Sequence, residues 1–205
     1  MNKPQGFDET QGFSSYEVLE EGGHILRILN VEERKSKAGN DMIVISFDTD
    51  KTDGQPGYFK ERYDSDTRSE KKWPAGGRTY QVCTGSNGNC SKGLKTFIEC
   101  VEASNNGFKV QWGNNFAACL KNKLIGGCFG KEEYLNSYGE SKFTIKLSGF
   151  RTVQDVKDGK VQAPKPKMLD NNSGNYGGNS YSNDGFGNGS FDDDIAPVSD
   201  DNMPF

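Results

Sequence analysis

The chain has 205 residues, of which 32% are hydrophobic and 26 are glycine, and its formal net charge is −4. A chain of this length accommodates one domain plus appendages, and its low apolar content excludes a fold in which every segment is buried. No stretch approaches the roughly 20 consecutive apolar residues that a transmembrane helix needs, so we expect no membrane partner.

The charge is distributed unevenly along the chain. Residues 170–205 contain seven Asp and no Lys or Arg, whereas residues 1–169 contain 25 basic and 22 acidic residues. The body therefore carries about +3 and the tail −7. Such a split is typical of a body that binds a polyanion and a tail that does not, although +3 is also ordinary for a body of this size.

The cysteines and the N-terminus predict a reduced, cytoplasmic protein. The five cysteines are an odd number without a CxxC pair, and the first 21 residues are polar and lack the apolar core of a signal peptide. Cys83, Cys90 and Cys100 are spaced by seven and ten residues, which is not the spacing of a zinc finger or ribbon. We therefore expect neither a metal nor another cofactor.

Enzyme chemistry is not indicated. The sequence has no GxSxG, P-loop, HExxH or dinucleotide-binding motif. The one histidine, His24, lies in an expected strand, where a packing or surface role is more common than a role as a base. We expect no catalytic residues.

The first part of the chain predicts an arm followed by strands. Residues 1–21 form a polar N-terminal arm, and alternating or continuous apolar residues predict strands at 24–33 and 41–48. An aromatic-rich stretch, 58–63, is expected to be the third strand. The polar stretch 64–78 is expected to be a long surface loop.

Helices and two more strands are expected next. Ser91 is a helix cap, and the helix runs to about residue 104 because Leu94, Phe97, Ile98 and Val101 share one face. A second short helix follows Asn115. Alternating apolar residues then predict strands at 124–135 and 142–150.

This order, in which a helical insert separates three strands from two further strands, is that of an oligonucleotide-binding (OB) barrel. The expected fold is therefore mainly β: a five-stranded OB-type barrel in residues 22–155, with a helical insert between strands 3 and 4 and a disordered C-terminal tail. A small mixed α+β sandwich is the alternative. Residues 156–190, rich in Pro, Gly, Asn and Ser, predict a flexible linker, and residues 191–205 an acidic protein-interaction tip.

Basic and aromatic residues are interleaved where such a barrel would bind single-stranded nucleic acid. Lys and Arg neutralise phosphates, and aromatic rings stack on bases. In the expected strand 58–63, Tyr58, Lys60 and Arg62 face outward and Phe59 is core. Trp73 lies in a polar loop beside cations, where a core role is less natural. The candidate nucleic-acid-binding residues are Arg34, Lys35, Lys37, Tyr58, Lys60, Arg62, Lys71, Lys72, Trp73, Arg78, Lys121, Lys123, Lys131 and Tyr134.

The last six residues combine an Asp pair with a short apolar end. An Asp pair stays solvated, whereas Phe205, beside its α-carboxylate, has no reason to be exposed unless a partner's pocket binds it. This end resembles the C-terminal tip of bacterial single-stranded DNA-binding proteins, in which an acidic run precedes Ile-Pro-Phe. Here Met203 replaces Ile, and Asn202 interrupts the acids. The candidate partner-binding residues are Asp200, Asp201, Met203, Pro204 and Phe205.

A second resemblance involves residues 120–126, 129–134 and Gly139, together with the turn at 36–40. These are similar to a pattern in small phage-encoded proteins to which single-stranded DNA binding is ascribed, and the likeness spans residues 13–155. The two resemblances imply a protein that coats single-stranded DNA in phage or mobile-element replication or recombination, in the host cytoplasm. They also imply recruitment of replication or recombination enzymes through the tip.

The sequence leaves several questions open: the size of the binding site, the choice between DNA and RNA, which enzymes bind the tip, and whether any cysteine binds a metal. A protein-interaction or DNA-mimic protein, which acts through its acidic tail without binding nucleic acid, is the alternative function. The sequence also leaves open whether the protein forms a homo-oligomer.

Overall fold

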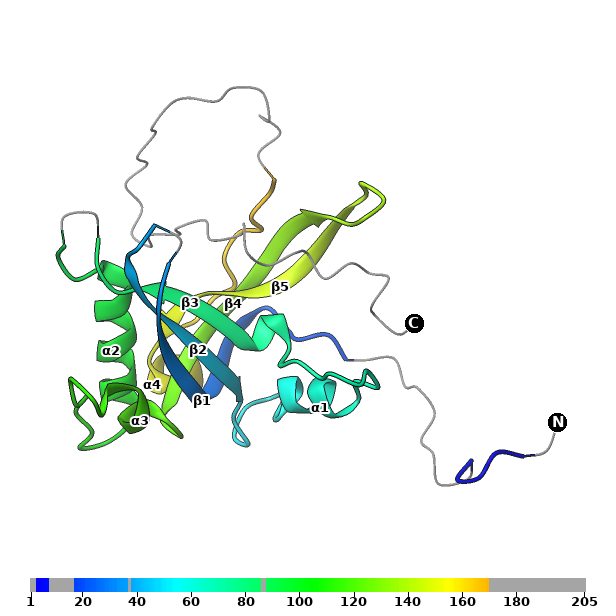
Figure 1. The fold of residues 1–205 in the computed structure, drawn as a ribbon, viewed down its shortest axis with the longest axis horizontal. Coiled ribbons are helices and arrows are strands. Elements are labelled where there is room, and N and C mark those ends of the chain that lie inside the picture. The colour runs from blue at the N-terminus through cyan, green and yellow to red at the C-terminus, as the bar shows by residue number, and fades with distance from the viewer. Residues whose placement is uncertain (1–2, 8–16, 37, 86–87, 170–205) are drawn as a thin grey trace.

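A single antiparallel sheet organises the computed structural model, which describes residues 3–7, 17–36, 38–85 and 88–169 (Figure 1). The strand order across the sheet is β3-β2-β1-β4-β5. The strands are β1 (Gly22–Lys35), β2 (Asp41–Thr49), β3 (Arg78–Val82), β4 (Leu124–Leu135) and β5 (Ser141–Arg151). The helices are α1 (Tyr58–Asp64), the 3-10 turn η1 (Ala75–Gly77), α2 (Lys92–Ser104), α3 (Phe116–Leu120) and α4 (Val153–Lys157).

The mainly β fold with five strands is confirmed, and the expected helical insert, α2 and α3, lies between β3 and β4. The predicted cap of α2 is also confirmed: the Ser91 hydroxyl accepts a hydrogen bond from the Leu94 N–H at 3.1 Å. The insert is small, since α3 spans only Phe116–Leu120.

A β-bulge in β1 brings two apolar residues onto one face that strict alternation would place on opposite faces. Ile28 pairs with Phe47 and Asn30 pairs with Ser46, so Leu29 is the extra residue of β1. Because of this insertion, both Ile28 and Val31 point into the core, although they are three residues apart. The bulge bends the strand, and the sheet curves with it.

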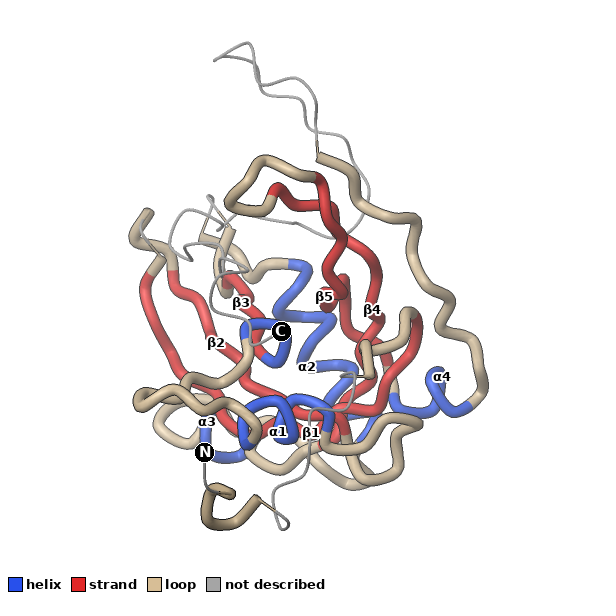
Figure 2. Tube along the Cα trace, turned by 90° about the vertical axis from the view of Figure 1, so that its right-hand side faces the viewer, coloured by secondary structure: helices blue, strands red, loops and turns tan. Residues whose placement is uncertain are grey.

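The core fills the concave side of the curved sheet. α2 contacts β3, β4 and β5, and Figure 2 shows it between the two halves of the sheet. Where α2 packs on the sheet, the centroid of the Phe97 ring of α2 lies 5.0 Å from that of the Phe150 ring of β5. The rings of Phe47, Phe59 and Phe129 form a second cluster, with centroids 5.7–6.5 Å apart.

The expected third strand is wrong, because residues 58–63 form α1 instead. The N–H groups at the start of this helix are bonded by side chains at the end of β2: Asp48 accepts from Phe59 N, and the Thr49 hydroxyl accepts from Tyr58 N, both at 2.9 Å. Asp48 lies eleven residues before Phe59, and Thr49 lies nine residues before Tyr58. The real third strand, β3, begins at Arg78, where the expected loop ends.

Closure into a barrel is also not found. β3 and β5 are the two edges of the sheet, and in the described part of the chain no strand pairing joins them. Instead η1, which leads into β3, lies beside β5. A Cβ added to Gly76 would lie 3.9 Å from the backbone oxygen of Ile145.

Residues 158–169, which follow α4, run along β4 (Figure 2). They lie within residues 156–190, the range that was expected to be a flexible linker. The Lys167 carbonyl accepts from Glu133 N at 2.8 Å, and the Lys167 N–H donates to the Lys131 carbonyl at 2.9 Å. These bonds cover the edge of β4 beyond the point where β1 begins. Among the described residues, no helix is long and apolar enough to span a bilayer.

Candidate nucleic-acid interface

The outer face of β1, β2 and β3 is the side of the sheet opposite the core. Residues paired across an antiparallel sheet point to the same side, so the register defines this face. Its three rows, listed from β1 through β2 to β3, are Asn30–Ser46–Arg78, Glu32–Val44–Tyr80 and Arg34–Met42–Val82. The outer face thus carries one aromatic residue in its central row and an arginine in each flanking row.

Tyr80 occupies the middle of the edge strand on this face. It is half-buried, and its cross-strand neighbour Val44 is 5% exposed although it points away from the core. Val44 is therefore covered from the outer side. Tyr80 thus lies, partly covered, on a sheet surface between the rows of two arginines, and aromatic rings are the side chains on which bases stack.

The arginines of the outer face differ in their partners. Arg34 forms an ion pair with Glu32 at 2.6 Å, in which both side chains are about half exposed. Exposed pairs of this kind contribute little to stability, so a phosphate can replace the carboxylate at low cost. Arg78 is exposed and lies at the opposite corner of the face. Lys35, at the tip of the same hairpin as Arg34, pairs with Asp41 at 2.6 Å.

Tyr80 was missed by the sequence prediction, which sought strand 3 in the aromatic-rich stretch 58–63. The alternation in 78–82 places Arg78, Tyr80 and Val82 on one side. That signal is five residues long and directly follows a polar loop, so it is easily read as the end of the loop.

Six other predicted binding residues are brought together around α1, not on the face of a strand. The Arg62 guanidinium donates to the Tyr58 hydroxyl at 2.6 Å, and Lys60 pairs with Asp64 at 2.5 Å. Lys71 lies 5.8 Å from the Tyr63 ring centroid. The full group is Tyr58, Lys60, Arg62, Lys71, Lys72 and Trp73.

Trp73 has a structural role in this group. Its indole N–H lies 3.0 Å from the Gly77 carbonyl and 3.3 Å from that of Phe47. Phe47 follows Ser46, the last residue of β2 that pairs with β3, so the indole occupies the position just beyond the start of β3. Half-buried and tilted against the Tyr63 ring, Trp73 fixes the start of the edge strand. Its predicted contact with a base stays a prediction.

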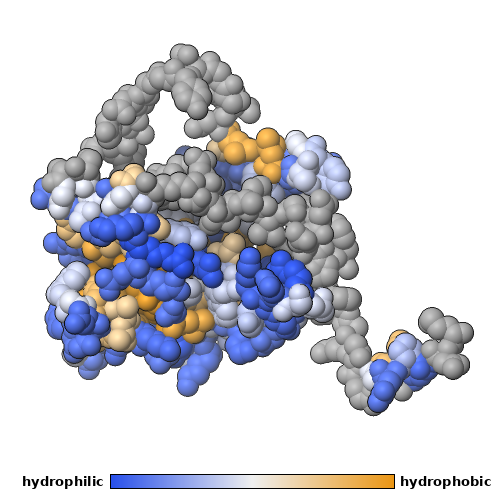
Figure 3. Space-filling model, viewed as in Figure 1, coloured by the Kyte–Doolittle hydropathy of each residue, from blue (hydrophilic) through white to orange (hydrophobic). Residues whose placement is uncertain are grey.

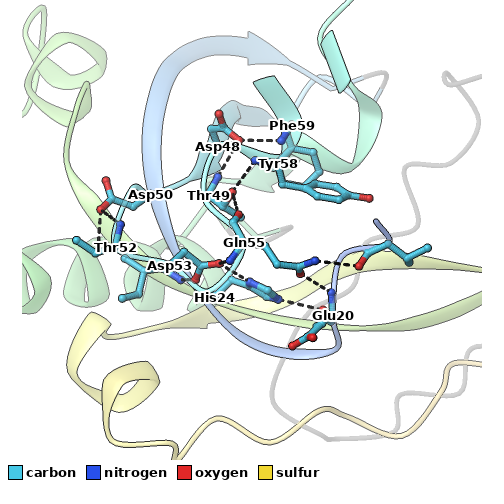
Figure 4. A network of polar contacts seen from close by, with 12 residues as sticks. Glu20, His24, Asp48, Thr49, Asp50, Thr52, Asp53, Gln55, Tyr58 and Phe59 are labelled. Carbon is cyan, nitrogen blue, oxygen red and sulfur yellow. Dashed lines mark hydrogen bonds and ion pairs between the residues drawn. The ribbon is translucent and has the colours of Figure 1, made fainter. Parts of the chain in front are cut away.

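A buried polar network fixes the connection between β2 and α1 (Figure 4). The Asp53 carboxylate accepts from Ile25 N at 2.6 Å and from Gln55 N at 3.0 Å, and its Oδ2 lies 2.8 Å from His24 Nδ1. Asp50 binds the Arg27 guanidinium at 2.5 Å. The connection between β2 and α1 is therefore bonded to β1 at two points, through Asp53 and through Asp50.

Ionisation in this network follows from burial and partners. Burial on its own lowers the pKa of His24, but the hydrogen bond to Asp53 and the charge of that carboxylate outweigh it, so the pKa lies above its usual value. Burial raises the pKa of Asp48. The hydrogen bonds that its carboxylate accepts from backbone N–H groups lower the pKa, but they offset the effect of burial only in part. The His24 side chain is 5% exposed, and both of its ring nitrogens have a partner within the network.

The remaining candidates lie at other places in the fold. Lys121 and Lys123 lie in the loop before β4, and Lys131 and Tyr134 lie on β4, where Lys131 pairs with Glu21 at 2.6 Å. Lys37 and all five residues of the tip lie outside the described residues.

In the described part of the chain, no group of three or more His, Cys, Asp or Glu residues is arranged to hold a metal ion. All five cysteines are free, and burial raises the pKa of the Cys83 and Cys100 thiols to about 11.

Comparison with known proteins adds no relative to these observations. No protein-family model matches the sequence. No curated protein matches it either.

Proposed function

We propose that the protein binds single-stranded DNA on the outer face of β1, β2 and β3, and that it coats DNA during phage or mobile-element replication or recombination. The observation that carries the proposal is the central row of this face, where Tyr80 lies between the rows of Arg34 and Arg78. A ring for stacking and cations for phosphates are the two parts that sequence-tolerant binding of a single strand needs.

The strand order supports an OB-type fold. An OB domain is a five-stranded, partly open Greek-key barrel. The sheet here also has five strands, in the order β3-β2-β1-β4-β5, and it stays open between β3 and β5. The helices between β3 and β4 occupy the corresponding connection, and the outer face of β2 and β3 is the face that binds oligonucleotides in OB domains.

A competition experiment tests the proposal. A fluorescent oligothymidine is bound to the full chain and then displaced with unlabelled single strand or with duplex of equal length. We expect the single strand to compete better, because duplex bases are not available for stacking. No binding at micromolar protein would favour the alternative, a protein that acts through its acidic tail alone.

The tip of residues 200–205 is proposed to recruit replication or recombination enzymes. A tethered weak motif raises the local concentration of its partner at the DNA. Removal of Phe205 should abolish capture of such enzymes and leave the DNA-binding isotherm nearly unchanged. Equal capture with and without Phe205 would refute a role for the tip.

A further inference from the structure

We propose that Trp112 forms a second base-stacking site, which a single strand reaches when it extends beyond β1. This inference rests on the proposed function and adds a site to it. Trp112 is 66% exposed, yet its ring is stacked on that of Phe116, with centroids 5.2 Å apart and planes 17° apart. Phe116 is itself 6% exposed and belongs to the core. One ring face of Trp112 is therefore anchored to the core while most of the side chain faces solvent.

Residues 108–112, which precede α3, run alongside α3 and the loop that follows it. Trp112 meets Phe116, the Gln111 N–H donates to the Cys119 sulfur at 3.4 Å, and the Lys123 ammonium lies 4.4 Å from the Phe108 ring centroid. These three contacts pair residues 108–112 with 116–123 in antiparallel order. The exposed indole and the lysines after α3 therefore belong to one surface.

The charges of this surface favour an anionic partner. Lys121 is exposed, and among the described residues neither Lys121 nor Lys123 forms an ion pair. The nearby Glu102 carboxylate is occupied, because it binds Lys109 at 2.6 Å and Val110 N at 3.0 Å. An aromatic ring with two uncompensated lysines matches a base and its flanking phosphates better than it matches an apolar protein segment.

This surface is joined to the outer face through the backbone of β1. The Asn122 N–H donates to the Ile28 carbonyl at 2.8 Å, and the Ile28 N–H donates to the Lys123 carbonyl at 2.9 Å. Asn122 adopts a left-handed backbone, with φ of 64°. The loop thus takes the place of a strand beside β1, on the side away from β2.

The two sites are close enough for one strand to connect them. Across the sheet, the lysine loop is three strand spacings of about 4.8 Å from β3. Along β1, its partner Ile28 is four residues from Glu32, which shares a row with Tyr80. In Figure 3, apolar surface gathers over the region of α2 and α3, on the side that faces the viewer in Figure 1. A short oligonucleotide would fill the outer face alone, and a longer one would also cover Trp112.

The test compares two oligothymidines, of about 5 and about 20 nucleotides, which bracket the site sizes of OB domains. Trp112→Ala should weaken binding of the long oligonucleotide about 5-fold or more, the loss of one base stack. Binding of the short one should stay unchanged. Trp112→Phe, which keeps a ring, should restore most of the affinity. Phe7→Ala removes an equally exposed aromatic ring from the N-terminal arm and serves as the matched control.

Each outcome decides the proposal. Unchanged binding of both lengths by Trp112→Ala, with normal binding by the wild type, would overturn the second site and leave the proposed function intact. Equal loss at both lengths, or a change in self-association alone, would also overturn it. A wild type that binds neither oligonucleotide would overturn both proposals. Thermal unfolding of each variant separates a lost contact from a lost fold.

Discussion

His24 illustrates how one residue's partners set its charge. Both of its hydrogen-bond partners, the Asp53 carboxylate and the Glu20 carbonyl, can only accept, at 2.8 and 3.0 Å. A neutral imidazole has one N–H and can satisfy only one of them, whereas the imidazolium satisfies both. Through Glu20, this residue also ties the end of the N-terminal arm to the sheet.

Stability should depend on pH through His24. Its folded-state pKa lies above the unfolded value of 6.5, so its contribution is fully present below that value and is lost as the pH rises through the folded-state pKa. Urea unfolding of the wild type and of His24→Gln measures this contribution. The difference in unfolding free energy should be larger at about pH 5.5 than at about pH 9. A difference that is independent of pH would refute the charged state.

At the scale of elements, the segment along β4 depends on a single glycine. A Cβ at Gly130 would lie 2.4 Å from Pro164 Cγ, closer than any real Cβ contact, so Gly130→Ala forces the segment away from β4. Overpacking of this kind should lower the free energy of unfolding by no more than about 1–3 kcal/mol. Trypsin should then cleave faster after Lys167, which Met168 follows, as mass spectrometry of the fragments would show.

A matched substitution controls for the loss of glycine itself. Gly54 has no atom within 4 Å of an added Cβ, so Gly54→Ala should leave the cleavage rate unchanged. Equal rates for Gly130→Ala and the wild type would show that Pro164 does not pack on β4.

The elements also show which parts of the fold the sequence predicts. α2 could be predicted because its cap, Ser91, and its apolar face are local in sequence. α1 could not, because its first N–H groups are bonded by Asp48 and Thr49, at the end of another strand. Local aromatic content favoured a strand there, and tertiary hydrogen bonds overrode it.

The same reason limits prediction of the interface. The cations of the first hairpin were found from composition, because Arg34 and Lys35 stand beside a recognisable turn. Tyr80 was not found, because its importance depends on which residues lie across from it in β2 and β1. Register is a property of the folded sheet, and one residue of shift would turn Tyr80 into the core.

At the scale of the whole molecule, the charge split predicts competition between the tail and DNA. The tail carries seven acids without a base, and the body is about +3. We expect deletion of residues 192–205 to tighten binding of oligothymidine, most strongly at low salt, where screening is weakest. The affinity of full-length and shortened chains measured across a salt series tests this. Equal affinity at every salt concentration would contradict it.

The central claim is that single-stranded DNA binds across Tyr80 and its flanking arginines. Fluorescence polarisation of oligothymidine across a salt series, with the wild type, Tyr80→Ala and Arg78→Ala, tests it most directly. The log affinity of the wild type should fall linearly with log salt. Tyr80→Ala should lose about 1–3 kcal/mol of binding free energy with an unchanged slope, and Arg78→Ala should make the slope shallower by about 0.7. A flat salt response, or wild-type affinity in both variants, would contradict the claim.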